Sequence, residues 1–284
     1  MEPTGPTIDG ATAALGTLHG KARQIAPALA RSGLKVIVER IDTNAFGTFS
    51  GDVPRRGSPE QVVVAKARSA AEAAGIDLGL ASEGSFFAHP DVPFITTNLE
   101  LVALVDRRSG STVIGRSRQL APWAHSMTVD RAGLCRVVTS FGLPDQAVLL
   151  RLPGSDSASP TGGRAVMDIR TEAQLMAAFR SVVGPGDGPV RVEPDLRADR
   201  CPPRRLAIAA AAEDLAARLM RICDECGSPG VGLERVDPGL PCAWCAGPTL
   251  EVLRRVCVCP SCGGESVEAV QGTADAGSCP RCNP

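Results

Sequence analysis

Hydrophobic and polar residues follow two different patterns along residues 8–200. Short apolar runs rich in branched side chains predict strands, and longer amphipathic segments predict helices. The expected strands lie at 11–17, 34–41, 78–81, 99–106, 147–152, 165–169 and 190–193. The expected helices lie at 20–31, 58–74, 130–141 and 172–183. Strands that alternate with helices predict an α/β fold with a mixed or parallel sheet.

An alanine-rich segment at 203–222 predicts a helix that leads into the C-terminal part of the chain. Its apolar stripe would consist of Leu206, Ala210, Leu215 and Leu219, and we expect this stripe to pack on the α/β domain. The predicted parts are an α/β ligand-binding or catalytic domain, a connecting helix and a double zinc-ribbon region, at 1–200, 201–222 and 223–284. A segment rich in glycine, serine and proline at 153–163 predicts a surface loop.

The cysteines predict metal sites. Eight of the eleven form four pairs in which two residues separate the cysteines. Pairs with this spacing are typical of structural zinc sites, and a disulfide framework is less expected in a chain without an evident signal peptide. The spacing favours two sequential ribbons, but a cross-braced arrangement, first pair with third and second with fourth, stays open. The expected zinc ligands are Cys223, Cys226, Cys242, Cys245, Cys259, Cys262, Cys279 and Cys282.

The other three cysteines lie outside these pairs. Cys257 lies two residues before Cys259 and is expected to be a spare, although it could replace Cys259 as a ligand. Cys135 falls in a predicted helix, where a small core residue is the simplest interpretation, and Cys201 stands alone.

Charge argues against a nucleic-acid-coating protein. The chain has 284 residues, and its 30 basic and 31 acidic residues give a net charge of −1. From residue 220 on, the chain has five arginines and eight acidic residues. Two zinc ions with eight thiolates would lower the net charge of this region to about −7. A phosphate backbone would be repelled, so nucleic acid is disfavoured and we expect the ribbons to have a structural or protein-contact role. No apolar run is long enough to span a membrane, and the start lacks the pattern of a signal peptide, so we expect a cytoplasmic protein.

The first candidate for chemistry is the turn between the first expected strand and helix. Thr17, His19, Gly20 and Lys21 stand there. Amide groups at a helix N-terminus and a lysine can bind an anion, although an ordinary strand–helix turn explains the same residues.

Two further segments add polar residues to the ends of expected elements. Asp42 and Thr48 lie in a loop that could face a ligand, and the next helix carries Lys66. Ser82, Glu83 and Ser85 follow the apolar run at 78–81. The end of a strand in an open α/β sheet is where such groups bind ligands, so Glu83 could hold Mg²⁺ beside a phosphate. The alternatives are a solvated loop for Asp42 and a turn carboxylate for Glu83.

The last candidates lie further along the chain. His125 is one of three histidines, all in expected loops, which favours a shared polar site. Arg197 begins a group with Arg200, Arg204 and Arg205 that could bind phosphate, or form the solvated start of a helix.

Several of these motifs together resemble a bacterial family, the domain of unknown function 6671. They are T-x-H-G-K at 17–21, D-T-x-x-x-G-T-F at 42–49, A-S-E-G-S-F at 81–86, Ala124-His125, and the helix with its C-x2-C-G-x-P-G continuation at 211–230. The resemblance implies a zinc-ribbon C-terminus and supplies no activity.

A more distant resemblance implies a chemistry. The inosine/xanthosine triphosphate pyrophosphatases have a similar order of motifs, which here would be Thr17 to Lys21, the G-T-F run at 47–49, Lys66-Ala67 and Ser82-Glu83-Gly84. His19 stands where an asparagine is expected, and the acidic turn holds one carboxylate instead of two.

Two functional hypotheses follow. The first is a Mg²⁺-dependent hydrolase of a nucleotide or another phosphorylated small molecule, with Lys21, Lys66 and Glu83 as its catalytic residues. The binding residues would be Thr17, His19, Gly20, Asp42, Thr48, Ser82, Ser85, His125 and Arg197. The alternative is a non-enzymatic binding or adaptor protein that uses its ribbons for protein contacts, because no complete catalytic signature is present.

Overall fold

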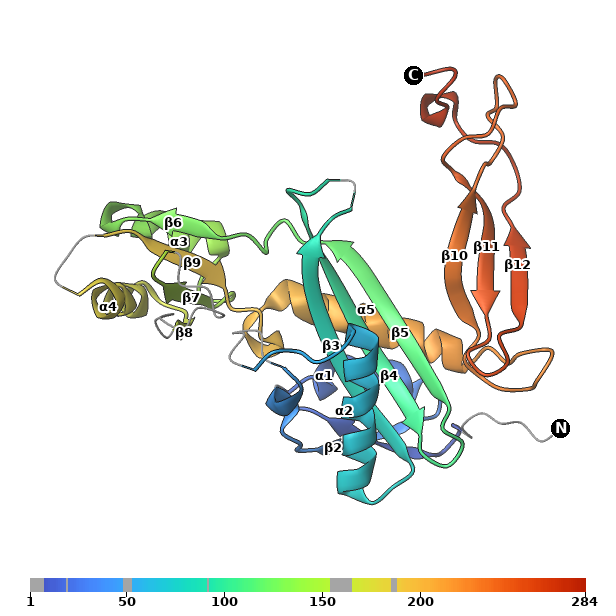
Figure 1. Cartoon of the computed structure of the whole chain (residues 1–284), viewed down its shortest axis with the longest axis horizontal. Helices are drawn as coiled ribbons and strands as arrows, with labels where there is room; N and C mark the ends of the chain where they lie inside the picture. Colours follow the sequence, from blue (N-terminus) through green and yellow to red (C-terminus); the bar gives the residue numbers. More distant parts are fainter. Residues whose placement is uncertain (1–7, 19, 48–52, 91, 154–164, 185–187) are drawn as a thin grey trace.

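The computed structural model describes residues 8–18, 20–47, 53–90, 92–153, 165–184 and 188–284. Their strands form three sheets, which follow one another along the chain except that the last helix returns to the first sheet (Figure 1). The mixed α/β class that the sequence predicts is confirmed.

The first sheet has the strand order β2-β1-β3-β4-β5. β1 runs parallel to both of its neighbours, and β3, β4 and β5 are antiparallel to one another. The strands are β1 (Thr12–Gly16), β2 (Lys35–Glu39), β3 (Leu78–Ala88), β4 (Thr96–Asp106) and β5 (Thr112–Leu120). β5 was not predicted from the sequence, because the residues after its first three positions are mostly polar and do not form an apolar run.

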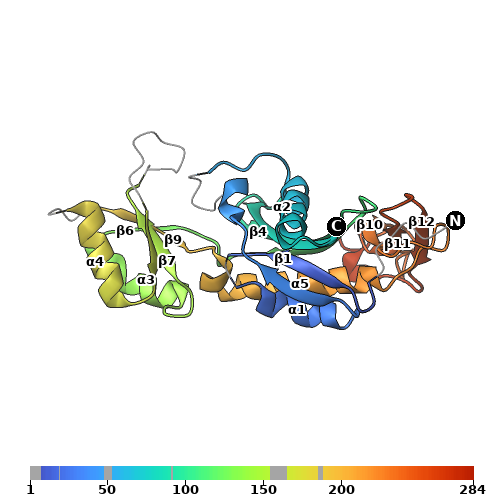
Figure 2. The same cartoon turned by 90° about the horizontal axis from the view of Figure 1, so that it is seen from below.

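Three helices cover the two faces of this sheet. Figure 2 shows α2 (Pro59–Ala74) on one face and α1 (Ala22–Ala30) with α5 (Pro202–Leu219) on the other. α2 begins with the capping box expected at Ser58 and Gln61. The α5 face buries the larger apolar cluster, which includes leucines and alanines of β1, β3, α1 and α5.

The approach of α5 to the sheet depends on a glycine. A Cβ at Gly115 would lie 2.2 Å from the carbonyl oxygen of Ala211, so β5 has no room there for another residue. The expected apolar stripe of α5 is half correct: Leu215 and Leu219 are buried, but Leu206 and Ala210 are exposed. Their places are taken by Ala207, Ile208, Ala211 and Ala212.

The two strands that follow β1 in the sequence lie on opposite sides of it in the sheet. It passes from β1 through α1 to β2 on one side, and then through α2 to β3 on the other side of β1. The carboxyl ends of β1 and β3 therefore flank a topological switch point. Open α/β sheets bind their ligands at such points, because the two crossover connections leave on opposite faces.

The second sheet is antiparallel and has the order β6-β9-β7-β8. Its strands are β6 (Met127–Val129), β7 (Val148–Arg151), β8 (Val166–Ile169) and β9 (Val190–Pro194). The helices α3 (Leu134–Phe141) and α4 (Glu172–Val183) pack on it around a separate apolar cluster. The strands between residues 127 and 194 thus belong to a sheet of their own. Of the expected loop at 153–163, residues 154–163 lie outside the described part of the chain.

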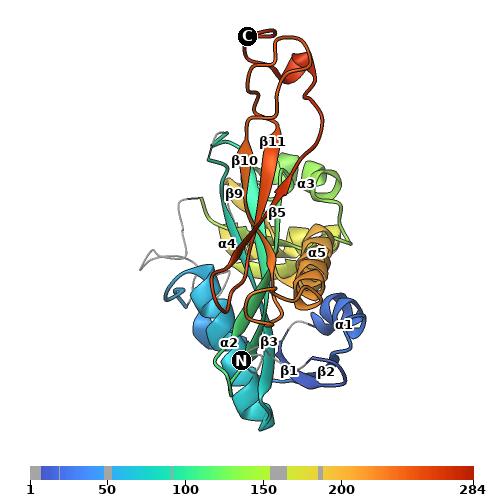
Figure 3. The ribbon, with the colours of Figure 1, turned by 90° about the vertical axis from the view of Figure 1, so that its right-hand side faces the viewer.

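The third sheet is a long antiparallel ribbon that extends away from the first sheet (Figures 1 and 3). It contains β10 (Gly232–Pro238), β11 (Val252–Val258) and β12 (Glu265–Ala269) in that order. Short 3-10 helices occur at Thr43–Phe46, Arg131–Gly133, Ala198–Arg200 and Ala276–Ser278. No helix in the described residues has the length and apolar character of a membrane span.

Candidate functional site

Eight cysteines form two groups of four, in the cross-braced arrangement. The first pair of the sequence joins the third, and the second joins the fourth. The sequential arrangement that the spacing favours is therefore wrong, because antiparallel pairing of β10, β11 and β12 brings alternate turns to the same end of the ribbon. The groups are Cys223, Cys226, Cys259 and Cys262, and Cys242, Cys245, Cys279 and Cys282.

The sulfur separations fit a metal ion. The Sγ–Sγ distance is 3.7 Å for the pairs Cys223–Cys262, Cys226–Cys259 and Cys245–Cys279. The Cys242–Cys282 pair is 3.9 Å apart. Four sulfurs about 2.3 Å from a tetrahedral zinc ion lie about 3.8 Å from one another. A disulfide needs about 2.05 Å, so these pairs are thiols placed as metal ligands and not cross-links.

The two metal groups cap opposite ends of the ribbon. We call the group with Cys223 the proximal cluster, because it follows α5 directly, and the group with Cys242 the distal cluster. Cys257 is not a ligand. It lies buried in β11 opposite Ser266, and its sulfur accepts a hydrogen bond from Arg221 at 3.4 Å. Of the remaining cysteines, Cys135 is exposed on α3 instead of in the core.

Polar contacts fasten the proximal end of the ribbon to the first sheet. Arg218 on α5 pairs with Asp214 at 2.7 Å and donates to the carbonyl oxygen of Leu233 on β10, also at 2.7 Å. Asp214 in turn accepts from the backbone nitrogen of Arg116 on β5. The predicted role of the alanine-rich helix, to pack on the sheet and carry the ribbon, is confirmed by these contacts.

The second candidate site lies at the switch point between β1 and β3. Lys21 stands at the N-terminus of α1, and its Nζ donates to the Ser82 hydroxyl at 2.9 Å. Thr17, at the end of β1, is buried beside this turn, and Gly20 has a φ of +63°, which favours glycine. The structure therefore brings Lys21 and Ser82 together as a pair.

Glu83 lies on the other face of β3, where successive side chains alternate. Its Oε2 lies 2.6 Å from Lys66 Nζ on α2, and its Oε1 lies 2.7 Å from Arg55 Nη2. Arg55 also donates to the Ser85 hydroxyl and to the Gly84 carbonyl oxygen. Each carboxylate oxygen thus faces a cation. The expected end of this strand at residue 81 is wrong, and so is the alternative of a turn carboxylate, because β3 continues through residues 82–88, where it pairs with β4.

A buried ion pair backs the same strand on the α5 face. Arg204 Nε lies 2.6 Å from Glu100 Oε1, and both side chains are almost wholly buried. Asn98 donates to the same carboxylate at 3.2 Å. A Cβ at Gly84 would lie 2.3 Å from Arg204 and 2.6 Å from Glu100, so the glycine of the Ser-Glu-Gly-Ser run leaves room for this pair.

These groups influence one another electrostatically. The pKa of Lys21 is lowered from 10.5 to about 7, chiefly by burial and also by the positive charges of Arg204 and Lys66. The carboxylates of Glu100 and Glu83 oppose the shift. Four cations around two carboxylates leave the cluster with a charge of +2 when Lys21 is protonated. We call Lys21, Arg55, Lys66, Ser82, Glu83, Glu100 and Arg204 the switch-point cluster.

One expected binding residue occupies another place, and two others cannot be placed. Asp42 caps the 3-10 helix after β2 by accepting from the backbone nitrogen of Asn44. His19 and Thr48 lie outside the described residues.

His125 belongs to the second sheet. It stacks on Phe141 and lines a cavity of about 170 Å³ with Arg151, Arg191 and Glu193. The position of His125 does not support the expected polar site shared by the three histidines. Its ring Nδ1 lies 3.0 Å from the carbonyl oxygen of Pro122.

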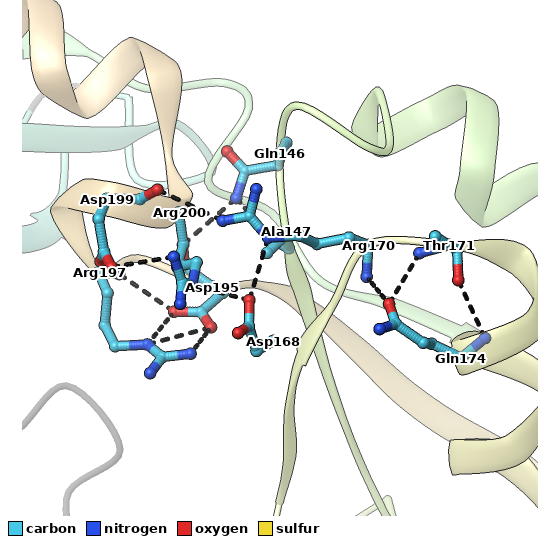
Figure 4. A network of polar contacts seen from close by, with 10 residues as sticks. All are labelled: Gln146, Ala147, Asp168, Arg170, Thr171, Gln174, Asp195, Arg197, Asp199 and Arg200. Carbon is cyan, nitrogen blue, oxygen red and sulfur yellow. Dashed lines mark hydrogen bonds and ion pairs between the residues drawn. The ribbon is translucent and has the colours of Figure 1, made fainter.

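Arg197 pairs with a buried carboxylate of the same loop. Figure 4 shows its guanidinium directed at Asp195, with Nε 2.9 Å from Oδ1, and Arg200 directed at Asp168. The hydrogen bond to Asp195 raises the pKa of Arg197. The arginine group expected to bind phosphate is therefore divided: Arg197 and Arg200 serve internal ion pairs, and Arg204 joins the switch-point cluster.

Arg55, a member of the switch-point cluster, was not predicted from the sequence, and neither was Asn98, which donates to Glu100. Arg55 lies in a segment without periodic pattern, and Asn98 looks like an ordinary strand residue. Arg204 was grouped with arginines that serve other ion pairs, because its partner Glu100 is 104 positions away and only the fold brings the two together.

One family model matches residues 66–284, and its description is domain of unknown function (DUF6671). The chain belongs to this family. The matched residues of DUF6671 include Lys66, Glu83, Glu100, Arg204 and both metal clusters, whereas Lys21 and Arg55 precede them. The first two motifs of the resemblance, at 17–21 and 42–49, also lie before the match. Among curated proteins, no match was found.

Proposed function

We propose that the first sheet of this DUF6671 protein binds a phosphorylated small molecule, of which a nucleotide is the leading class, at the switch point and hydrolyses it. The observation that carries the proposal is the convergence of Lys21, Lys66 and Arg55 on the β3 extension beside the end of β1. Two of the chain's three lysines belong to this group.

The charge of the cluster supports an anionic ligand. Glu83 neutralises one of the cations Lys66 and Arg55, and Glu100 neutralises Arg204. The excess charge of +2 is matched by a phosphate dianion, and charge-assisted hydrogen bonds to phosphate are among the stronger polar contacts in proteins. Lys21 lies at the start of α1, where the helix dipole adds to the attraction.

The roles of the residues follow from their positions. Lys21 and Ser82 would contact the phosphate from the α1 side, and Lys66 from the α2 side. Their cations would stabilise the charge that builds up on the transferred phosphoryl group. Glu83 would act as a positioning residue that fixes Lys66 and Arg55. Thr17 and Gly20 would line the site beside the end of β1, and Ser85 would help to hold Arg55. We assign no role there to Asp42, His125 or Arg197. The order of motifs shared with the nucleoside triphosphate pyrophosphatases is a further argument for a nucleotide.

A magnesium ion held by Glu83 fits this geometry poorly. Mg²⁺ prefers carboxylate oxygens that are open to it, and both oxygens of Glu83 are already within 2.7 Å of cations. The expected role of Glu83 as a magnesium ligand therefore stays a prediction from sequence. A substrate can also bring Mg²⁺ on its own phosphates.

The direct test is release of phosphate or pyrophosphate from ordinary and deaminated nucleoside triphosphates, with Mg²⁺ present. Lys21→Met and Lys66→Met are expected to lower kcat/KM by roughly 100-fold or more, the loss of about 2.7 kcal/mol of transition-state stabilisation. Lys35→Met, at an exposed lysine on β2, is the matched control and should leave turnover unchanged. Full activity in Lys21→Met would contradict the proposal.

Binding without turnover is the second candidate. In that case wild-type protein binds phosphate compounds and Lys21→Met does not, but no product appears with any nucleotide. The two candidates share the site and differ only in the outcome of the turnover assay.

We further propose that both cysteine clusters hold zinc. Tetrahedral sulfur sites are typical of Zn²⁺ or iron, and the turns with two intervening residues are typical of structural zinc. A reducing compartment such as the cytoplasm keeps such thiols available, which supports a cytoplasmic location. Elemental analysis of protein purified without added metal should give two zinc ions per chain.

A further inference from the structure

Two surfaces of the molecule combine exposed apolar side chains with opposite charge and lie far apart in one chain. The first is the distal knuckle, which we define as residues 240–251 and 272–284 around the distal cluster. The second is a groove between α1 and α5 with a volume of about 440 Å³.

The distal knuckle presents large apolar side chains to solvent. Trp244 stands between the two cysteines of its turn and is 81% exposed, and Leu250 nearby is 83% exposed. Trp is the residue most enriched among binding hot spots, and soluble proteins seldom leave such a pair uncovered.

The distal knuckle is also acidic. Within these ranges the acidic residues are Glu251 and Asp275, and the basic residue is Arg281. Four thiolates around a divalent ion add −2, which brings the total to about −3. A partner surface for this knuckle should therefore combine apolar contact with positive charge.

The groove between α1 and α5 has this combination. Pro27, Ala209 and Leu206 give it apolar walls, and Leu206 is 74% exposed. Arg23 and Arg205 line it, and Glu213, its only acid among the described lining residues, pairs with Arg31. A tryptophan can also stack under an arginine, which adds a cation–π contact.

The knuckle does not reach the groove of its own chain. Figures 1 and 3 both place the distal end of the ribbon away from α1. We propose that the distal knuckle of one chain docks in the α1–α5 groove of a second copy, and that reciprocal docking gives a closed dimer. Docking has to be reciprocal, because a one-way contact of this type would propagate from copy to copy into a filament. When each of two copies places its distal knuckle in the groove of the other, the assembly is closed as a dimer.

The test is sedimentation equilibrium of the full-length, metal-loaded chain at several concentrations. Wild type should be a dimer, and Trp244→Ala should raise its dissociation constant by at least about 30-fold, as expected for a hot-spot residue. Leu206→Asp should do the same from the groove side. Val267→Ala, at an exposed apolar residue of β12, is the matched control and should dimerise like wild type.

Mixing the two variants distinguishes reciprocal knuckle-to-groove docking from other modes of association. Trp244→Ala keeps an intact groove and Leu206→Asp an intact knuckle, so equal amounts should form a heterodimer with one contact, whereas each alone is monomeric. A wild-type monomer at all concentrations overturns the proposal. A Leu206→Asp dimer that Trp244→Ala abolishes would show knuckle-to-knuckle pairing and overturn it too. Circular dichroism shows whether each variant is folded, and none of these outcomes depends on the switch-point cluster.

Discussion

Arg204 and Glu100 form an ion pair across 104 positions of the chain, with Arg204 Nε 2.6 Å from Glu100 Oε1. The arginine is 1% exposed and the glutamate 0%. The pair joins α5 to β4 directly behind the strand that carries Ser82 and Glu83. It therefore links the helix that holds the metal-binding ribbon to the candidate site.

Breaking this pair should destabilise the fold strongly. Glu100→Gln leaves a buried guanidinium without its counter-ion, which should cost about 3–5 kcal/mol of unfolding free energy. Urea denaturation followed by circular dichroism measures the loss. The double variant Glu100→Leu with Arg204→Met removes both charges and should lose less than either single change. A single variant that stays within about 1 kcal/mol of wild type would show that the pair contributes little.

The protonation of Lys21 should govern anion binding. Its pKa is lowered to about 7, so the lysine loses its charge as the pH rises through neutrality. Affinity for sulfate, which stays a dianion over this range, should fall above pH 7 with a slope approaching about tenfold per pH unit. Calorimetric titration between pH 6 and 9 measures it.

Lys21→Arg is the control for this profile, because an arginine keeps its charge over the whole range. It should bind sulfate with little pH dependence. Equal slopes in wild type and Lys21→Arg would show that another group titrates.

The same shift predicts a stability profile. Between pH 7 and 10.5 the unfolded chain holds a proton at Lys21 that the folded chain has lost, so stability contributed by this group rises with pH over that window. Lys21→Met should remove this rise, and denaturation at pH 7 and pH 9.5 would show whether it does.

The Glu83→Gln variant distinguishes two roles of this carboxylate, positioning Lys66 and Arg55 or binding a metal ion. The change removes one negative charge from between Lys66 and Arg55, so the net charge of the cluster rises by one. Sulfate affinity should increase by roughly tenfold, or about 1.4 kcal/mol, while turnover falls because the cations lose their fixed positions. If Glu83 instead holds Mg²⁺, the variant should lose affinity for nucleotides only when Mg²⁺ is present.

Cross-bracing of the cysteines makes an unambiguous prediction for two double variants. Cys226→Ser with Cys259→Ser damages only the proximal cluster, so one zinc ion per chain should remain. Cys226→Ser with Cys245→Ser damages both clusters, and no tightly bound zinc should remain. Sequential ribbons would give the reverse result. Native mass spectrometry of the full-length variants measures the metal content.

The sequence predicted local features well. The capping signals of α2 and the strand character of β1 and β2 agree with the structure, and all eight cysteines expected as ligands lie in groups that could hold a metal ion. Each of these features depends on neighbours within a few positions. Cysteine pairing was predicted wrongly, since it depends on which strands of the ribbon lie side by side.

The candidate site shows the same division. Lys21, Lys66 and Glu83 were selected as polar residues at expected element ends, but only Lys21 lies at one: Lys66 is in the middle of α2 and Glu83 in the middle of β3. Their contacts were not predicted, because Arg55 has no motif around it and Glu83 was expected after the end of its strand. The extension of β3 past Ala81 arises from pairing with β4, which begins three residues before the strand expected at 99–106.

The most direct test of the switch-point site is calorimetric titration of the full-length protein with inorganic pyrophosphate at pH 6.5, where Lys21 is mostly protonated. Wild type and Lys35→Met should bind one pyrophosphate per chain with equal affinity, and Lys21→Met should lose at least about tenfold. Wild type that does not bind, or Lys21→Met that binds as tightly as Lys35→Met, would contradict the account.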